Sequence, residues 1–116
     1  MRGRRENNNM KKEKLFDNPI EDKPHPLVKE GGSGFQKIYR FSNGYGASVV
    51  RFKLMGGRYG SYTDNETEFE LAVLKFNSKN NKDFKLVYDT PITEDVVGHL
   101  TEDGVEEKLQ AIKVLD

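Results

Sequence analysis

Hydrophobic and polar residues alternate with a period of two over four stretches in the later part of the chain, and this period predicts β-strands. The stretches are residues 35–41, 47–54, 67–76 and 83–88. Asn43-Gly44 stands between the first two stretches and favours a tight hairpin, because both residues tolerate positive φ. Residues 77–82 are polar and predict a longer hairpin loop between the last two stretches. The pattern therefore predicts a meander of four antiparallel strands.

A helical period replaces the strand period near the C-terminus. Val105, Leu109 and Ile112 recur at i, i+4 and i+7. Thr101 precedes them as a candidate N-cap. These signals predict a helix whose apolar stripe packs on the sheet, and a second capping pattern predicts a short turn of helix over Thr93 to His99. The expected fold class is α+β, a four-stranded antiparallel meander packed by a C-terminal helix.

Residues 1–34 show neither period. Their larger apolar residues are irregularly spaced, and prolines interrupt any helix. We expect a flexible polar N-terminal arm, either a disordered leader or an extended peptide that lies on another surface. It ends in Gly31-Gly32-Ser33-Gly34, a composition typical of a flexible linker, so the arm is either native or fused on by design. The expected boundaries are 1–34 for arm and linker and 35–116 for the α+β domain.

The composition limits the classes of function. The chain has 19 lysine and arginine residues and 19 aspartate and glutamate residues, so its formal net charge is zero. This balance argues against a protein whose whole surface attracts nucleic acid. It has no cysteine, which excludes disulfides and thiolate metal sites. No apolar run reaches the roughly 18–20 residues of a membrane span, so we expect a cytoplasmic protein without a membrane partner.

Basic residues gather at the extreme N-terminus. They include Arg2, Arg4, Arg5, Lys11 and Lys12. A basic tail of this kind can hold phosphates, although most such tails are simply solvated. Nucleic-acid binding through these residues is therefore the alternative function.

Candidate catalytic groups are few. His25 and His99 are the two histidines, and neither has neighbours typical of a catalytic site, so we expect no enzyme and no cofactor. Glu66, Glu68 and Glu70 recur at every second residue and could share one strand face. Such a row either attracts a divalent cation or forms a solvated face that protects a sheet from aggregation. We expect the solvated face and no metal.

The stretch from Met55 to Asn65 combines glycines with tyrosines and predicts a long loop. It has neither the glycine spacing of a dinucleotide-binding motif nor that of a phosphate-binding P-loop. Tyrosine and arginine are enriched at binding hot spots, and loops carry function more often than cores do. The residues predicted to bind a partner are Tyr45, Arg58, Tyr59 and Tyr62.

Three stretches carry a resemblance to a known group of proteins. They are residues 41–50 (FSNGYGASVV), 68–74 (EFELAVL) and 86–101 (LVYDTPITEDVVGHLT). They resemble small uncharacterised proteins encoded by bacteriophages and prophages of Gram-positive bacteria. The resemblance covers roughly residues 35–116 and implies a phage accessory protein in the bacterial cytoplasm, with no activity or site residues to transfer. Another protein is the expected partner, and the sheet edges could also pair with a second copy of the chain.

Overall fold

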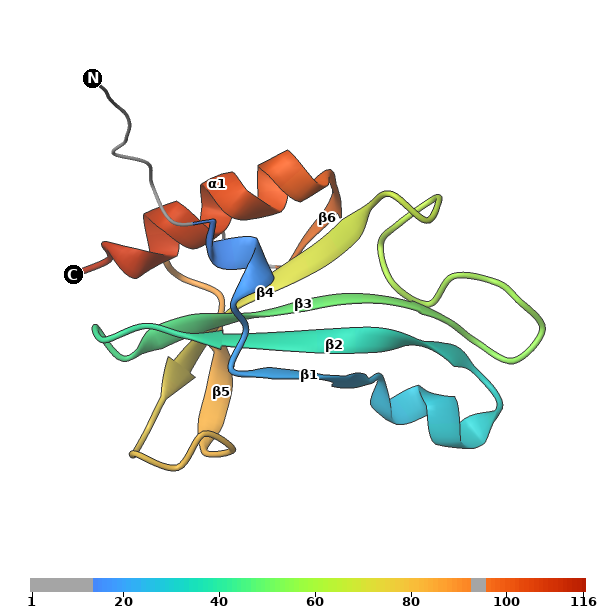
Figure 1. Ribbon diagram of the computed structural model, residues 1–116, viewed down its shortest axis with the longest axis horizontal. Coiled ribbons are helices and arrows are strands. Elements are labelled where there is room, and N and C mark those ends of the chain that lie inside the picture. Colours follow the sequence, from blue (N-terminus) through green and yellow to red (C-terminus); the bar gives the residue numbers. More distant parts are fainter. Residues whose placement is uncertain (1–13, 93–95) are drawn as a thin grey trace, which may run out of the picture.

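The computed structural model describes residues 14–92 and 96–116 as one antiparallel sheet with a helix across it (Figure 1). Its elements are η1 Leu15–Asp17, β1 Glu21–Pro24, η2 Pro26–Glu30, β2 Ser33–Arg40, β3 Tyr45–Lys53, β4 Phe69–Phe76, β5 Phe84–Val87, β6 Val97–Leu100 and α1 Glu102–Lys113. The predicted α+β class and the antiparallel sheet are confirmed. The predicted count of four strands is wrong, because the sheet has six.

The strands follow the order β1-β2-β3-β4-β5, and all neighbours are antiparallel. β2 and β3 form the predicted hairpin, with Tyr39 opposite Ala47 and Arg40 opposite Gly46. The outer edge of β4 is shared by two strands. β5 pairs with its second half, where Phe76 lies opposite Phe84, and β6 pairs with its first half.

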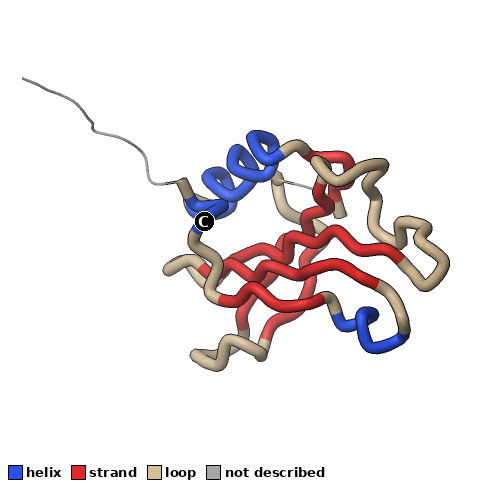
Figure 2. The backbone as a smooth tube through the Cα atoms, turned by 45° about the vertical axis from the view of Figure 1, so that its right-hand side comes forward, coloured by secondary structure: helices blue, strands red, loops and turns tan. Residues whose placement is uncertain are grey.

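α1 crosses one face of the sheet and closes the main core (Figure 2). Val105, Leu109 and Ile112 are each completely buried, so the predicted apolar stripe is confirmed. They pack against alternate residues of β2, β3 and β4, which the register places on one face. These residues are Tyr39, Ala47, Val49, Phe69, Leu71 and Val73. The period of two on the strands and the period of the helix therefore meet in a single apolar layer.

The chain from Lys14 to Gly34 corrects the prediction of a flexible arm. Leu15 and Phe16 are buried in the main core, with 6% and 8% of their surface exposed. The Tyr39 hydroxyl donates a hydrogen bond to the Phe16 carbonyl at 2.7 Å. β1 then pairs along β2, which begins at Ser33, before the expected boundary. Tertiary contacts order a segment whose own sequence shows no period, while the remainder of the expected arm, 1–13, lies outside the described residues.

Two glycines of the expected linker stand at positions where the structure requires glycine. Gly31 ends η2 in the left-handed conformation, with φ 90°. Gly34 has φ 138°, and a Cβ on it would lie 2.3 Å from the Arg51 carbonyl oxygen on the neighbouring strand. Glycine alone fits both demands without strain. The residues expected to form a linker thus build the turn from η2 into β2, and fusion by design stays a prediction.

The short helical turn expected over Thr93 to His99 is corrected as well. Val97 to Leu100 form strand β6, and residues 93–95 lie outside the described residues. An irregular register separates the pair Phe69–Leu100 from the pair Leu71–Val97, and His99 between them has φ 55°. The first half of β4 would otherwise present unpaired backbone groups at its outer edge, and β6 satisfies them.

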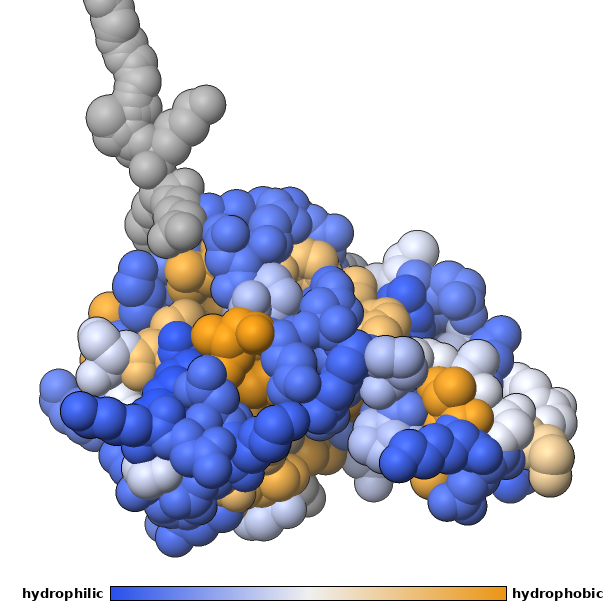
Figure 3. All heavy atoms as spheres, turned by 60° about the horizontal axis from the view of Figure 1, so that its bottom comes forward, coloured by the Kyte–Doolittle hydropathy of each residue, from blue (hydrophilic) through white to orange (hydrophobic). Residues whose placement is uncertain are grey.

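The surface opposite the helix is mostly hydrophilic, with separate hydrophobic patches, as Figure 3 shows for the side that faces the viewer. A smaller second cluster of Ile38, Leu74 and Phe76 lies under this side of the sheet, with Phe84 packed against it. The guanidinium of Arg40 lies 4.5 Å from the centre of the Phe76 ring and donates to the loop between β4 and β5. This hairpin therefore covers the second cluster.

Candidate functional site

The long loop between β3 and β4, residues 54–68, forms one end of the sheet, and its backbone is held at several points. Leu54 N–H donates to the Arg58 carbonyl at 2.8 Å, and Gly60 N–H donates to the Phe52 carbonyl at 3.0 Å. The buried hydroxyls of Ser61 and Thr63 lie 2.8 Å apart, and Phe52 N–H donates to the Ser61 hydroxyl at 3.1 Å. The predicted loop is therefore present, and it is anchored to the end of β3.

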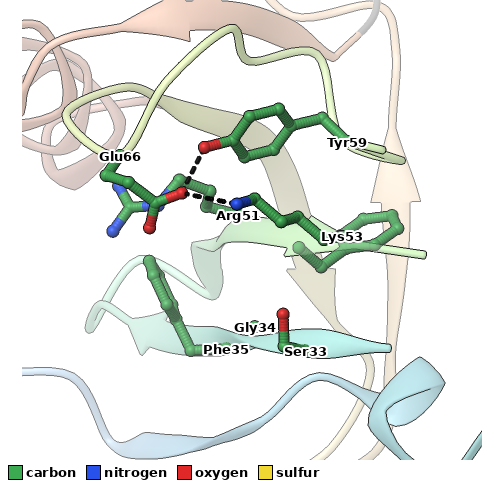
Figure 4. Close-up of a pocket in the computed structure, with 8 residues that line it drawn as sticks. Ser33, Gly34, Phe35, Arg51, Lys53, Tyr59 and Glu66 are labelled. Atoms are coloured by element: carbon green, nitrogen blue, oxygen red, sulfur yellow. Dashed lines mark hydrogen bonds and ion pairs between the residues drawn. The ribbon is translucent and has the colours of Figure 1, made fainter. Parts of the chain in front are cut away.

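A pocket of about 260 Å³ lies between this loop and the start of β2 (Figure 4). It is lined by Ser33, Gly34, Phe35, Arg51, Phe52, Lys53, Tyr59 and Glu66. In Figure 4 the side chains of Lys53 and Tyr59 point toward the Glu66 carboxylate, while β2 forms the opposite wall. Tyr59 and Glu66 of the loop thus form a polar wall of the pocket, and Gly34 and Phe35 of β2 form the wall opposite.

Glu66 is the centre of the polar contacts in this pocket. Its carboxylate accepts a hydrogen bond from the Tyr59 hydroxyl and lies 3.4 Å from Lys53 Nζ. The hydrogen bond from Tyr59, followed by the contact with Lys53, lowers the pKa of Glu66 below its ordinary value. The same hydrogen bond raises the pKa of Tyr59, because loss of the phenolic proton would place two negative charges together. The pocket therefore holds a carboxylate and a neutral phenol at neutral pH.

Arg51 supplies the second cationic group of the pocket. Its guanidinium carbon lies 5.0 Å from the centre of the Phe35 ring and 4.8 Å from that of Phe69. Its Nη1 donates to the Glu68 carbonyl at 2.9 Å. These contacts fix the guanidinium at the base of the loop, where Arg51 and Lys53 outnumber the single carboxylate of Glu66.

The structure divides the residues predicted to bind a partner. Tyr59 lines the pocket, Arg58 is exposed at the tip, and Tyr62 has 61% of its surface exposed on the same loop. Tyr45 begins β3 at the opposite end of that strand, half-buried, with Lys75 Nζ 4.2 Å from its ring centre. Three of the four residues therefore share the loop, and Tyr45 belongs elsewhere.

Arg51, Lys53 and Ser33 were missed as pocket residues. Arg51 and Lys53 lie two residues apart on β3, and Ser33 lies directly opposite Lys53 in the register of β2 and β3. The strand period puts Arg51 and Lys53 on one face of β3. The pocket around them forms because β2 pairs with β3 in this register and because the loop folds back over the end of β3.

The acidic row of Glu66, Glu68 and Glu70 does not converge. β4 begins only at Phe69, so the first two glutamates lie on the loop and do not follow a strand period. Glu66 faces the pocket, and Glu70 accepts a hydrogen bond from the Tyr62 backbone N–H at 2.9 Å. Glu68 instead reaches a histidine on β6.

Glu68 meets His99 and Asp64 at the edge of the loop. One carboxylate oxygen of Glu68 accepts from the Asp64 backbone N–H at 2.9 Å and lies 3.0 Å from His99 Nδ1. Asp64 Oδ2 lies 3.5 Å from the same nitrogen. The hydrogen bond from the Asp64 backbone, and then that with His99, lower the pKa of Glu68.

His25, the second histidine, has structural contacts. Its ring stacks on Phe52 with centres 3.9 Å apart, and its Nδ1 accepts a hydrogen bond from Leu27 N–H at 3.1 Å. Partial burial lowers the pKa of His25, because it penalises the charged form. A neutral imidazole that accepts at Nδ1 agrees with this shift.

The basic residues of the alternative function, Arg2, Arg4, Arg5, Lys11 and Lys12, lie outside the described residues. Nucleic-acid binding therefore stays a prediction. Among the residues that the structure describes, no helix is long and apolar enough to cross a membrane.

No family model, curated protein or solved structure matches this chain. What the fold and the site define is the class: an α+β protein with a six-stranded antiparallel sheet, whose long β3–β4 loop roofs a small cationic pocket.

Proposed function

We propose that the chain is a non-enzymatic protein-binding module whose contact surface is the loop from Met55 to Glu68. The observation that carries the proposal is the exposure of large apolar side chains on an anchored backbone. Met55 has 77% of its surface exposed and Tyr62 has 61%. Both side chains lie on the same anchored loop, where an exposed apolar group is available to contact a partner.

The anchoring of the loop supports this proposal through the cost of binding. A loop that is mobile in the free protein loses conformational entropy when it binds a partner. Here Tyr59, Glu66 and Lys53 connect the two halves of the loop to β3, and Ser61 fixes its middle to Phe52. The ordered backbone presents Tyr62 without that cost.

The pocket beside the loop supports the same surface. Burial beneath a partner would strengthen the interaction of a partner's polar or acidic side chain with Arg51 and Lys53, because the local dielectric constant falls. Tyrosine and arginine side chains near the centre of an interface carry much of its binding energy. The proposed partner is therefore a protein with an apolar patch and an acidic side chain beside it.

The non-enzymatic part of the proposal rests on the contacts of the two histidines. His25 is engaged by Phe52 and Leu27, and His99 by Glu68 and Asp64. The origin of the chain as a phage accessory protein, acting on a host or phage protein in the bacterial cytoplasm, is proposed on the resemblance of residues 41–50, 68–74 and 86–101 alone.

Site-specific photocrosslinking in bacterial cells tests the proposed surface. A photoreactive phenylalanine at position 55 or 62 should give discrete crosslinked species, identified by mass spectrometry. Position 114 is the matched control, because Val114 has 76% of its surface exposed but lies beyond the end of α1, away from the loop. Equal crosslinking from position 114, or none from 55 and 62, would contradict the proposal.

Substitution separates contact from folding. With the photoreactive phenylalanine placed at position 58 of the same loop, Met55→Ser and Tyr62→Ser should each remove the crosslinked species, while the urea midpoint of unfolding stays unchanged. Val114→Ser should leave both unchanged. If the crosslinked species contains only a second copy of this chain, the loop is a self-association surface, and the proposal of a different protein partner is wrong.

A further inference from the structure

We infer that Asp64, Glu68 and His99 form a binding site for a divalent transition-metal ion such as Zn²⁺. Each residue offers one ligand atom, and the three atoms lie within 4.8 Å of one another. This inference goes beyond the proposed protein-binding function and does not depend on it.

The distances suit a single ion. His99 Nδ1 lies 3.0 Å from Glu68 Oε1 and 3.5 Å from Asp64 Oδ2. Ligand atoms about 2.0–2.2 Å from one zinc ion lie roughly 3–4 Å apart in tetrahedral geometry. The three atoms therefore need only a small movement, and Asp64 can supply it because its side chain is 78% exposed.

The donor set distinguishes this cluster from an ordinary acidic patch. One ligand is the imidazole nitrogen of His99 on β6, and His99 lies 31 residues after Glu68 in the sequence. Imidazole favours zinc and its neighbours in the first transition row, whereas magnesium and calcium prefer oxygen ligands alone. One nitrogen and two carboxylate oxygens thus indicate a transition-metal ion over Mg²⁺.

The backbone around the cluster holds the ligands in place. His99 N–H donates to the Tyr62 carbonyl at 2.7 Å, which ties β6 to the loop two residues before Asp64. A Cβ on Gly98 would lie 2.3 Å from Tyr62 Cβ, so glycine permits this close approach. Asp64 N–H in turn holds the Glu68 carboxylate at 2.9 Å.

The loop is already anchored to β3 by hydrogen bonds. An ion bound by Asp64, Glu68 and His99 would in addition connect the loop to β6. Because an ion that binds only the folded chain stabilises it by mass action, added Zn²⁺ should raise the unfolding temperature. The effect requires both the loop ligands and His99.

Isothermal titration of the full chain, freed of metal with a chelator, with zinc chloride and separately with magnesium chloride tests the site. We expect one zinc ion per chain and no saturable heat from magnesium at the same concentrations. His99→Gln and Glu68→Gln should each weaken zinc binding at least about tenfold, the lower end of the losses found even for outer-shell partners. Glu107→Gln is the matched control and should bind zinc like the original chain, because Glu107 is an exposed residue of α1 and is not one of the three ligands.

NMR of the unsubstituted chain keeps the test valid if a variant fails to fold. The chain has two histidines, so the imidazole signals of His99 should shift on zinc addition while those of His25 stay in place. Absence of saturable zinc binding, unchanged binding in His99→Gln, or a shift confined to His25 would overturn the inference.

Discussion

Glu106 shows how one half-buried residue of α1 orders the segment that contains η1. Its carboxylate accepts hydrogen bonds from Leu15 N–H at 3.0 Å and Phe16 N–H at 2.8 Å, and from Gln110 at 2.7 Å. These backbone groups belong to η1 and have no place in the sheet ladder. Partial burial by itself would raise the pKa of Glu106, but the hydrogen bonds from Gln110, Phe16 and Leu15 outweigh it and lower the pKa.

This lowered pKa predicts a pH dependence of stability. A carboxyl group with a lower pKa in the folded state stabilises the fold above its unfolded pKa, near 4.5, and loses that contribution as the pH falls through the folded value. Glu106→Gln should therefore lower the free energy of unfolding by about 1–2 kcal/mol at pH 7. The difference from the original chain should shrink below about pH 4.5.

Urea unfolding at several pH values between 3 and 7 measures this difference. Glu107→Gln is the control, because Glu107 is the next residue of α1 and its side chain is exposed. A Glu106→Gln penalty that stays constant from pH 7 to pH 3 would refute the assigned charge dependence.

At the scale of elements, the turn of the β2–β3 hairpin also caps the C-terminal end of α1. The Asn43 side-chain amide donates to the carbonyls of Ile112, Lys113 and Leu115 at 2.9, 3.2 and 2.9 Å. Its oxygen accepts from Tyr45 N–H at 3.0 Å. The sequence explains Asn43 by the turn alone, whereas in the structure it also binds carbonyl groups at the C-terminal end of α1 and just beyond it.

Asn43→Asp is predicted to destabilise the fold by about 2–3 kcal/mol. The carboxylate keeps the acceptor for Tyr45, but it replaces the donor to three carbonyls and places negative charge at the negative end of the helix dipole. The free energy of unfolding from urea titration measures the loss.

Asn80→Asp provides the comparison for that experiment. The Asn80 side-chain oxygen accepts from the backbone N–H of Lys82 at 2.9 Å, and aspartate can accept this bond too. Its effect on the free energy of unfolding should stay within about 0.5 kcal/mol. Equal losses in the two variants would show that the donor role of Asn43 is unimportant.

At the scale of the whole molecule, the N-terminal residues complete the core instead of preceding it. Leu15 and Phe16 pack among residues of α1 and the sheet, and the Phe16 ring meets Phe69 edge-on with centres 5.3 Å apart. η1, near the start of the described residues, therefore lies against α1, near their end, on the same face of the sheet.

A chain that begins at Phe35 is predicted to lose cooperative unfolding, because it lacks η1, β1 and two buried side chains of the core. Near-ultraviolet circular dichroism and urea titration measure this. In the full-length chain, Phe16→Ala should cost about 3–5 kcal/mol by itself, which separates loss of core packing from loss of strand β1. If a chain that begins at Phe35 unfolds at the same urea midpoint as the full chain, the domain boundary expected from the sequence, at residue 35, is correct.

Part of this fold follows from the sequence alone. Alternation located β2, β3, β4 and β5, Asn43-Gly44 located the hairpin, and the stripe of Val105, Leu109 and Ile112 located α1. These features depend on which residues each element buries, and burial leaves a period in the sequence. The same pattern pointed to the loop that carries Tyr59 and Tyr62, although it grouped the distant Tyr45 with them.

Tertiary structure decided the rest, because the remaining features depend on backbone pairing and on contacts between distant residues. β1 has the sequence Glu-Asp-Lys-Pro and, among the residues that the structure describes, pairs with β2 alone, so no apolar alternation reveals it. β6 is short and irregular, and its partner β4 determines where it pairs. The pocket needs the register of β2 with β3, and the Asp64–Glu68–His99 cluster needs β6 beside the loop. Sequence periods record burial within an element, whereas these sites arise where elements meet.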